Sequence, residues 1–234
     1  MLKKIALVGT FFSLFLVVIW GLCALLRSGS LLTLGGESAP VVVIDAGHGG
    51  EDGGALSLTG EKESVINLEI SLKLEQVLAL YGVETLMLRQ DDVDLSDMDY
   101  DTVRARKQSD LEHRVEIING VENPLFISIH QNSYSQEKYY GAQVFYTAQS
   151  EEFGMDMQET LRLGLDPENH RESKLVSDEI YIMNHIECGG LLIECGFLSN
   201  RVEAKKLETP EYQLKIALAI ASGVVQELAP TQQT

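Results

Sequence analysis

The fold of this chain of 234 residues is decided by the stretch Val41-Val42-Val43-Ile44-Asp45-Ala46-Gly47-His48-Gly49-Gly50. Its first four residues are apolar and β-branched without interruption, which is typical of a strand that is buried on both faces of a sheet. The run then changes to small residues and a histidine, and glycines let a backbone turn tightly and approach a ligand. The stretch therefore predicts a central strand that places His48 at the carboxyl end of a sheet.

Helical and strand patterns alternate downstream of this strand. Apolar residues between 64 and 81 recur with a helical period that stops at Gly82, and residues 102–119 form an amphipathic helix. Further strands are expected at 83–88, 125–129, 141–147 and 190–193, and further helices at 150–165 and 211–228. Strands separated by helices imply an α/β fold, with a single mostly parallel or mixed sheet flanked by helices.

The N-terminal segment has a different composition. Residues 5–26 contain no charged residue, and an α-helix needs about 20 apolar residues to cross a bilayer. Lys3 and Lys4 precede this run, so the N-terminus is expected to stay in the cytoplasm and the following domain outside it. The alternative is a cleaved signal peptide, whose apolar core is usually about 7–15 residues long. We favour a retained anchor at 1–27, a linker at 28–40, one domain at 41–228 and a tail at 229–234.

The charge of the chain excludes several partners. The sequence holds 35 acidic and 18 basic residues, for a net charge of −17, and three of the bases but none of the acids lie in residues 1–27. Such an acidic domain is repelled by the phosphates of nucleic acid and by anionic lipid. We therefore expect no nucleic-acid partner, and contact with a membrane only through the N-terminal helix.

Polar side chains follow three of the predicted strands. His48 comes after the first, His130 directly after Ile129, and Glu194 directly after Ile193. In open α/β sheets, ligands bind outside the carboxyl ends of the strands. Glu63 stands at the start of a helix that follows a glycine-rich loop. Two histidines and a carboxylate are a common catalytic zinc set, and a further carboxylate can act as general acid and base. The residues alone leave open which glutamate has which role.

Simpler interpretations compete with this one. A histidine at a strand end is more often a hydrogen-bonded structural group than a ligand. We assign three others to that class: His113, His170 and His185. Cys195 raises the hypothesis of a Cys–His nucleophile, although a free cysteine usually behaves as a small buried hydrophobe. The two glutamates could also form a glycosidase pair, but this leaves the strand-end histidines unexplained.

The motifs at the strand ends resemble those of zinc-dependent N-acetylmuramoyl-L-alanine amidases of the amidase-3 family. The matching stretches are residues 43–55, 63–68, 111–119, 128–132 and 192–200, and the similarity covers about residues 41–228. The resemblance implies a phosphorylase/hydrolase-like α/β fold. It also implies Zn²⁺ held by His48, Glu63 and His130, with Glu194 as the general base. We assign Asn132, in the second histidine motif, to substrate binding.

The match to the family pattern leaves one rival ligand. Glu61, followed by Lys62, imitates a Glu-Lys pair of the family, whereas Glu63 is followed by Ser64. The apolar register downstream favours Glu63. Gln131 stands where a small residue is common, which does not affect the proposed metal set.

The activity implied by the resemblance is hydrolysis of the amide between N-acetylmuramic acid and L-alanine in peptidoglycan. The short anchor, the single domain and the lack of wall-binding repeats resemble family members that prepare spore cortex for germination, as the first step to muramic-δ-lactam. That resemblance implies the spore intermembrane space as the location, and an activator lipoprotein as a partner, as in some clostridial relatives. The alternatives are a general cell-wall or division autolysin and a non-catalytic peptidoglycan-binding module.

Overall fold

The computed structural model of the chain describes residues 39–97 and 102–229. The predicted anchor, most of the linker and the last residues of the tail lie outside these ranges, so they stay predictions. Within the described ranges, no helix combines the length and the apolar character that a bilayer span requires.

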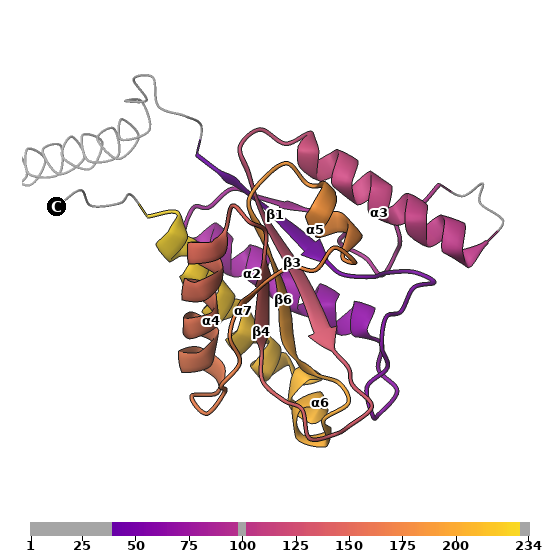
Figure 1. Cartoon of the computed structure of the whole chain (residues 1–234), viewed down its shortest axis with the longest axis vertical. Coiled ribbons are helices and arrows are strands. Elements are labelled where there is room, and N and C mark those ends of the chain that lie inside the picture. Colours follow the sequence, from indigo (N-terminus) through magenta and orange to yellow (C-terminus); the bar gives the residue numbers. More distant parts are fainter. Residues whose placement is uncertain (1–38, 98–101, 230–234) are drawn as a thin grey trace, which may run out of the picture. The chain divides into compact units, whose positions relative to one another are not determined.

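One six-stranded mixed sheet forms the centre of the described domain (Figure 1). The strands are β1 (Val41–Ala46), β2 (Thr85–Met87), β3 (Pro124–Asn132), β4 (Gln143–Tyr146), β5 (Lys174–Leu175) and β6 (Gly190–Phe197). Their order across the sheet is β2-β1-β3-β6-β4-β5. The strands β2, β1, β3 and β6 are parallel, whereas β4 runs antiparallel to β6. This confirms the predicted α/β fold with a mostly parallel, mixed sheet.

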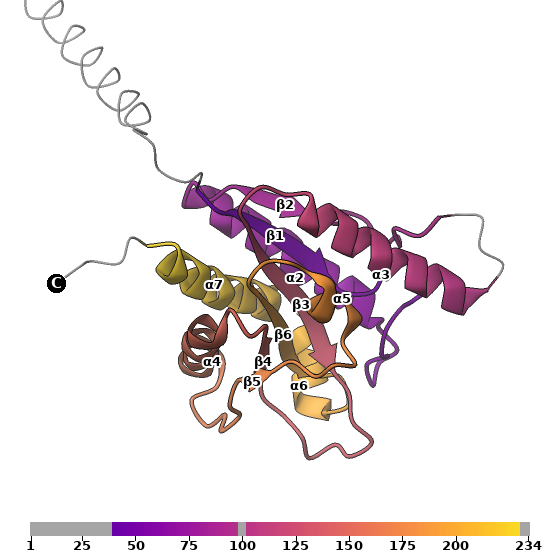
Figure 2. The same cartoon turned by 45° about the horizontal axis from the view of Figure 1, so that its top comes forward.

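Helices cover both faces of the sheet. The helices are α2 (Glu63–Leu80), α3 (Val103–Asn119), α4 (Glu151–Leu165), α5 (Tyr181–His185), α6 (Arg201–Leu207) and α7 (Pro210–Glu227). Val42 and Ile44 of β1 pack in the core with α2, α4 and α7, whereas Val43 packs with α3 and α5 on the other face. Figure 2 shows α4 and α7 on the opposite side of the sheet from α3 and α5. Because both faces of β1 are covered, its first four residues are all apolar.

Local chemistry explains where several helices begin and end. The hydroxyl of Thr102 accepts a hydrogen bond from the Ala105 N–H at the start of α3, and Thr209 caps α7 in the same way. Pro210 occupies the first turn of α7, where its missing N–H costs nothing. Gly82, just after α2, has φ +71°, a conformation that glycine adopts without strain.

The structure differs from the sequence prediction in two respects. The short elements β5, α5 and α6 were not predicted, because they are too short to show a period. Both β3 and β6 also extend past their apolar runs, so that His130 and Glu194 lie within paired strands and face each other in the register. Backbone pairing continues through polar residues, which a hydropathy pattern does not reveal.

Candidate active site

The carboxyl ends of β1, β3 and β6 bring the predicted residues together. One ligand atom from each of His48, Glu63 and His130 lies within 4.8 Å of the other two. Glu63 Oε1 is 3.0 Å from His130 Nδ1 and 3.3 Å from His48 Nε2. The two imidazole rings meet edge to face, with their centroids 4.9 Å apart. Two imidazole nitrogens and one carboxylate on a common centre are a donor set that suits a divalent metal ion such as Zn²⁺.

The far side of the His48 ring is held by a carboxylate. His48 Nδ1 lies 2.9 Å from Asp52, and the Asp52 carboxylate is also 2.8 Å from Lys107 of α3. Burial disfavours the charged form of His48, but the hydrogen bonds to Asp52 and Glu63 outweigh it and raise the pKa of His48 to about 9. In metal sites such a carboxylate fixes the tautomer and the orientation of the ring. The sequence analysis missed Asp52, although an acid four residues after His48 was a usable signal.

We expect the substitution Asp52→Asn to weaken metal binding about 10- to 100-fold, because loss of the outer carboxylate loosens the His48 ring and lowers its basicity. The affinity can be measured by competition with a chromophoric chelator. Glu51→Gln is the matched control, since Glu51 is the adjacent acid and pairs with Arg106 of α3 rather than with His48. Equal affinities for wild type and Asp52→Asn would contradict this role.

Glu63 is buried and its carboxylate is held from several sides. Oε2 accepts a hydrogen bond from the Ala55 N–H at 2.9 Å, and Oε1 accepts one from the Gln131 N–H at 3.1 Å. Burial alone would raise the pKa of Glu63, but the two site histidines lower it far below its usual value. Glu63 is therefore ionised, as a metal ligand must be. The rival Glu61 is exposed and lies outside the cluster formed by the described residues, so the geometry favours Glu63.

Glu194 stands apart from this donor set and has a different environment. Its Oε2 atom is buried and has no hydrogen-bond partner within the described part of the chain. Burial raises the pKa of Glu194 to about 7, although the charge of His130 opposes the shift. A carboxyl group with a pKa near neutrality can both accept and return a proton. The unsatisfied oxygen fits a group that meets a water molecule or a substrate rather than a structural acid.

Two buried arginines hold the backbone that carries His48. His48 has φ +62°, a left-handed conformation that costs free energy in any residue with a Cβ atom. Arg114 of α3 donates to the His48 carbonyl oxygen at 2.8 Å and also to the Asp45 carboxylate. Arg89 donates to the carbonyl oxygens of Ala46 and Gly47 at 2.8 and 3.1 Å. The arginines compensate for the strain by satisfying three successive carbonyl groups.

Gly47 is required by the close approach of His130. A Cβ atom built on Gly47 would lie only 2.2 Å from Nε2 of the His130 ring. A side chain here would push the imidazole away from Glu63, so the glycine of the motif has a steric function in the site.

The other residues considered in the sequence analysis lie outside the cluster of His48, Glu63 and His130. The remaining histidines are His113, His170 and His185, and none of them joins a potential metal cluster within residues 39–97 and 102–229. Cys195 packs in the core on the side of α2 and α7, opposite Glu194, and burial raises the pKa of its thiol. A protonated thiol on the far face does not support the nucleophile hypothesis. Asn132 is partly buried at the end of β3 and pairs with Phe197 in the register; its role in substrate binding stays a prediction.

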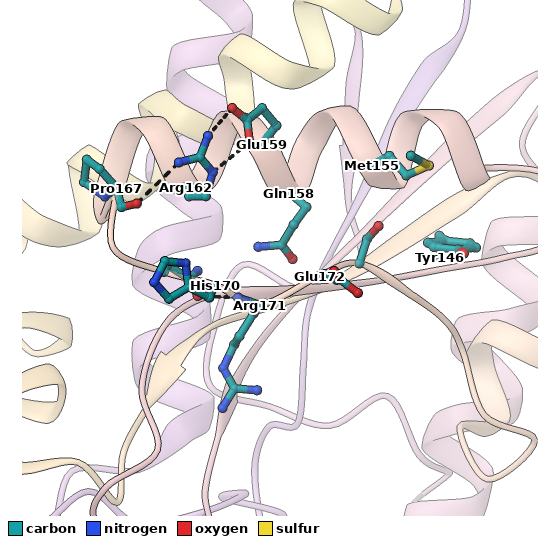
Figure 3. Close-up of a pocket in the computed structure, with 11 residues that line it drawn as sticks. Tyr146, Met155, Gln158, Glu159, Arg162, Pro167, His170, Arg171 and Glu172 are labelled. Atoms are coloured by element: carbon teal, nitrogen blue, oxygen red, sulfur yellow. Dashed lines mark hydrogen bonds and ion pairs between the residues drawn. The ribbon is translucent and has the colours of Figure 1, made fainter.

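The hollow drawn in Figure 3 lies beside α4, and none of His48, Glu63, His130 and Glu194 lines it. Two of its polar side chains bind within the fold: Arg162 pairs with Glu159, and Gln158 bonds to the backbone of Ala142 and Val144. A second cleft contains His48, His130 and Glu194 and is walled by α3 and by Tyr181 of α5. The chemistry therefore belongs to this second cleft.

An α/β sheet that presents two histidines and one glutamate to a common centre, with a second glutamate beside them, defines a hydrolase built around a metal-binding site. Comparison with known proteins agrees. The model of the Amidase_3 family, N-acetylmuramoyl-L-alanine amidase, matches residues 42–226. The chain belongs to this amidase family.

Individual relatives support the same assignment. The chain is 37% identical over 194 residues to the germination-specific N-acetylmuramoyl-L-alanine amidase of Bacillus subtilis, covering 81% of this chain and 80% of that protein. Among solved structures, the CwlD amidase from Clostridioides difficile, in complex with the GerS lipoprotein, matches with 40% identity and a TM-score of 0.78 over 81% of this chain and 98% of that one. The amidase AmiC2 of Nostoc punctiforme matches with 28% identity and a TM-score of 0.70, over 82% of this chain and 99% of that one.

Proposed function

We propose that this protein is a zinc-dependent amidase that hydrolyses the bond between N-acetylmuramic acid and L-alanine in peptidoglycan. The observation that carries the proposal is the convergence of His48, Glu63 and His130 on one centre, with the unsatisfied carboxylate oxygen of Glu194 nearby. Membership of the amidase family supplies the substrate class.

His48, Glu63 and His130 are the residues that would hold Zn²⁺. When bound, the ion supplies a Lewis acid that acidifies water and polarises a carbonyl group. Glu194 takes a proton from the attacking water, whose oxygen joins the lactyl carbonyl carbon of muramic acid. As the C–N bond breaks, Glu194 delivers this proton to the departing nitrogen of L-alanine. A pKa near 7 suits both steps, because the group must accept and release the proton in the same cycle.

The biological setting that we propose is the spore cortex, where removal of the peptide is the first step to muramic-δ-lactam. The similarity to a germination-specific amidase supports this setting. We further propose retention by the N-terminal helix, with the catalytic domain outside the cytoplasm, and activation by a lipoprotein. The complex of the CwlD amidase with GerS supports such a partner. A deletion strain whose cortex still contains normal muramic-δ-lactam would favour a role in division or autolysis instead.

We expect the purified protein loaded with zinc to release free stem peptides from peptidoglycan, detected by mass spectrometry. Removal of the metal with a chelator is expected to abolish the release, because the three ligands alone cannot polarise the carbonyl group, and added Zn²⁺ is expected to restore it. New reducing ends without free peptide, unaffected by the chelator, would identify a glycosidase. Binding to peptidoglycan without any cleavage would identify a binding module.

A further inference from the structure

Arg171 is a cation without an acidic partner at the same end of the sheet as Glu194. Its Nε donates to the Tyr140 carbonyl oxygen at 2.7 Å, and its Nη1 donates to Gln143 Oε1 at 2.8 Å. The guanidinium carbon lies 4.4 Å from the centroid of the Phe197 ring. All these partners are neutral, and no ion pair of Arg171 occurs within residues 39–97 and 102–229.

The partly buried guanidinium is therefore fixed in orientation. Two buried acids, Glu194 and Glu203, interact with its charge, but neither forms an ion pair with it in the described residues. Two of its nitrogens are engaged and one face of its plane is covered by an aromatic ring, whereas Nη2 donates to no group of the described chain. A charge removed from part of its water needs a counter-charge to offset the lost hydration. Arginine presents a planar fork that matches a carboxylate, which makes a carboxylate the ligand that best completes this group.

The register of the sheet connects Arg171 to the catalytic centre. Gln143 of β4 lies directly opposite Glu194 of β6 in the antiparallel pair, and opposite residues of such a pair project from the same face. Arg171 thus continues a row that runs from Glu194 to Gln143. Its positive charge also lowers the pKa of Glu194, against the effect of burial. In Figure 3 the Arg171 side chain, which is one of those lining the hollow beside α4, points away from Arg162 and Glu159.

The direction of the row indicates which part of the substrate meets Arg171. Glu194 delivers its proton to the nitrogen of L-alanine, so the departing peptide lies on the side of Glu194. The sheet order β3-β6-β4 places Gln143 and Arg171 beyond Glu194 when viewed from His130. An extended chain advances at most about 3.6 Å per residue, so the second residue of the peptide reaches about 7 Å past the cleaved bond. In a stem peptide whose second residue is a glutamate joined through its γ-carboxyl group, the α-carboxylate of that residue is free.

We propose that Arg171 binds the free α-carboxylate of the second stem-peptide residue and so makes the enzyme selective for peptides that carry this charge. The proposal rests on the amidase function proposed above. It assigns Arg171 to substrate recognition, whereas Glu194 and the three predicted metal ligands act at the cleaved bond. Loss of Arg171 should therefore act on the choice between substrates and mainly on KM, rather than on metal content.

The test uses two glycan–peptide substrates that differ only at this group, one with the α-carboxylate and one with the carboxamide of isoglutamine. We expect wild-type protein to favour the carboxylate about tenfold or more in kcat/KM, as loss of a charge-assisted hydrogen bond predicts. Arg171→Gln is expected to bring the ratio close to one, and Arg171→Lys to give an intermediate ratio because the charge stays but the fork is lost. Arg162→Gln, on the neighbouring surface, should keep the wild-type ratio.

The ratio of kcat/KM for the two substrates does not depend on the fraction of active protein, because inactive protein lowers both rates equally. A wild-type ratio near one, or an unchanged ratio in Arg171→Gln, would overturn the inference while leaving the amidase function intact. If wild type cleaves neither substrate, the proposed function itself fails. If Arg171→Gln does not fold, Arg171→Lys is compared with wild type instead. A ratio between one and that of wild type supports the proposal, whereas a ratio equal to that of wild type contradicts it.

Discussion

Glu194→Gln is expected to lower kcat about 10²- to 10⁴-fold while the protein keeps its full metal content. Glutamine has the same shape as glutamate, but it can neither accept a proton from water nor return one to the leaving nitrogen. The buried Oε2 atom of Glu194 has no partner in the described chain, so the substitution removes no structural hydrogen bond of that oxygen. Turnover is measured with peptidoglycan fragments, and bound metal by mass spectrometry of the same preparation.

Measuring both turnover and bound metal distinguishes a general base from a metal ligand at position 194. Glu187→Gln is the control, because Glu187 is exposed on the segment before β6 and should leave kcat unchanged. If Glu194→Gln also loses the metal, Glu194 is a ligand and the assignment of Glu63 must be revised. A decrease in kcat of less than about tenfold would remove Glu194 from the proton transfers.

Arg114→Leu is expected to reduce the free energy of unfolding by about 3–5 kcal/mol, because it leaves a buried carboxylate without its counter-charge. Arg114 is 1% exposed and bonds to both Asp45 and Asp110. Its loss would also remove the donor to the partly buried carbonyl oxygen of His48. Urea unfolding measures the change. Arg104→Leu, on the exposed side of the same helix, should stay within about 0.5 kcal/mol of wild type.

The same group makes the stability depend on pH. Burial alone would raise the pKa of Asp45, but Arg114 and the Ser128 hydroxyl lower it below its usual value. A carboxyl group with a lowered pKa in the folded state stabilises the fold above its unfolded pKa of about 4, and this stabilisation is lost as the pH falls further. Wild type should therefore lose stability on acidification below about pH 4 more steeply than Arg114→Leu does. An equal slope, or a loss of less than about 1 kcal/mol in Arg114→Leu, would contradict the role of the pair.

Sequence patterns predicted the elements that are long or strongly apolar, and the residues that follow them. The run at Val41–Ala46 and the glycines after it were sufficient to place His48. Because ligands bind outside the carboxyl ends of strands, His130 and Glu194 were expected at the same edge of the sheet. The choice of Glu63 as the ligand needed the resemblance to the family, because spacing alone did not distinguish it from Glu194. The positions of these elements and strand ends were predictable because periodicity and strand ends are properties of neighbouring residues, whereas the roles of Glu63 and Glu194 stay predictions.

The features that the sequence did not predict depend on contacts between residues that are far apart in the chain. Arg89 reaches the carbonyl oxygen of Ala46 across 43 positions of sequence, and no local pattern distinguishes it from a surface arginine. Arg171 lies in a loop without a helical or strand period, and its relation to Glu194 appears only from the register of β4 and β6. The antiparallel direction of β4 has the same origin, since it is defined by pairing with β6, which lies far downstream in the sequence.

The position of β6 has a consequence for the order of assembly. It is the last strand to be synthesised, yet it lies between β3 and β4, so β3 exposes an unpaired edge until almost the whole chain is available. Pairing of strands that are far apart in sequence is slow, and open edges of this kind promote association between incomplete chains. Truncations that remove β6 should therefore aggregate rather than yield a smaller soluble domain, and β6 must be synthesised before the catalytic cleft can form.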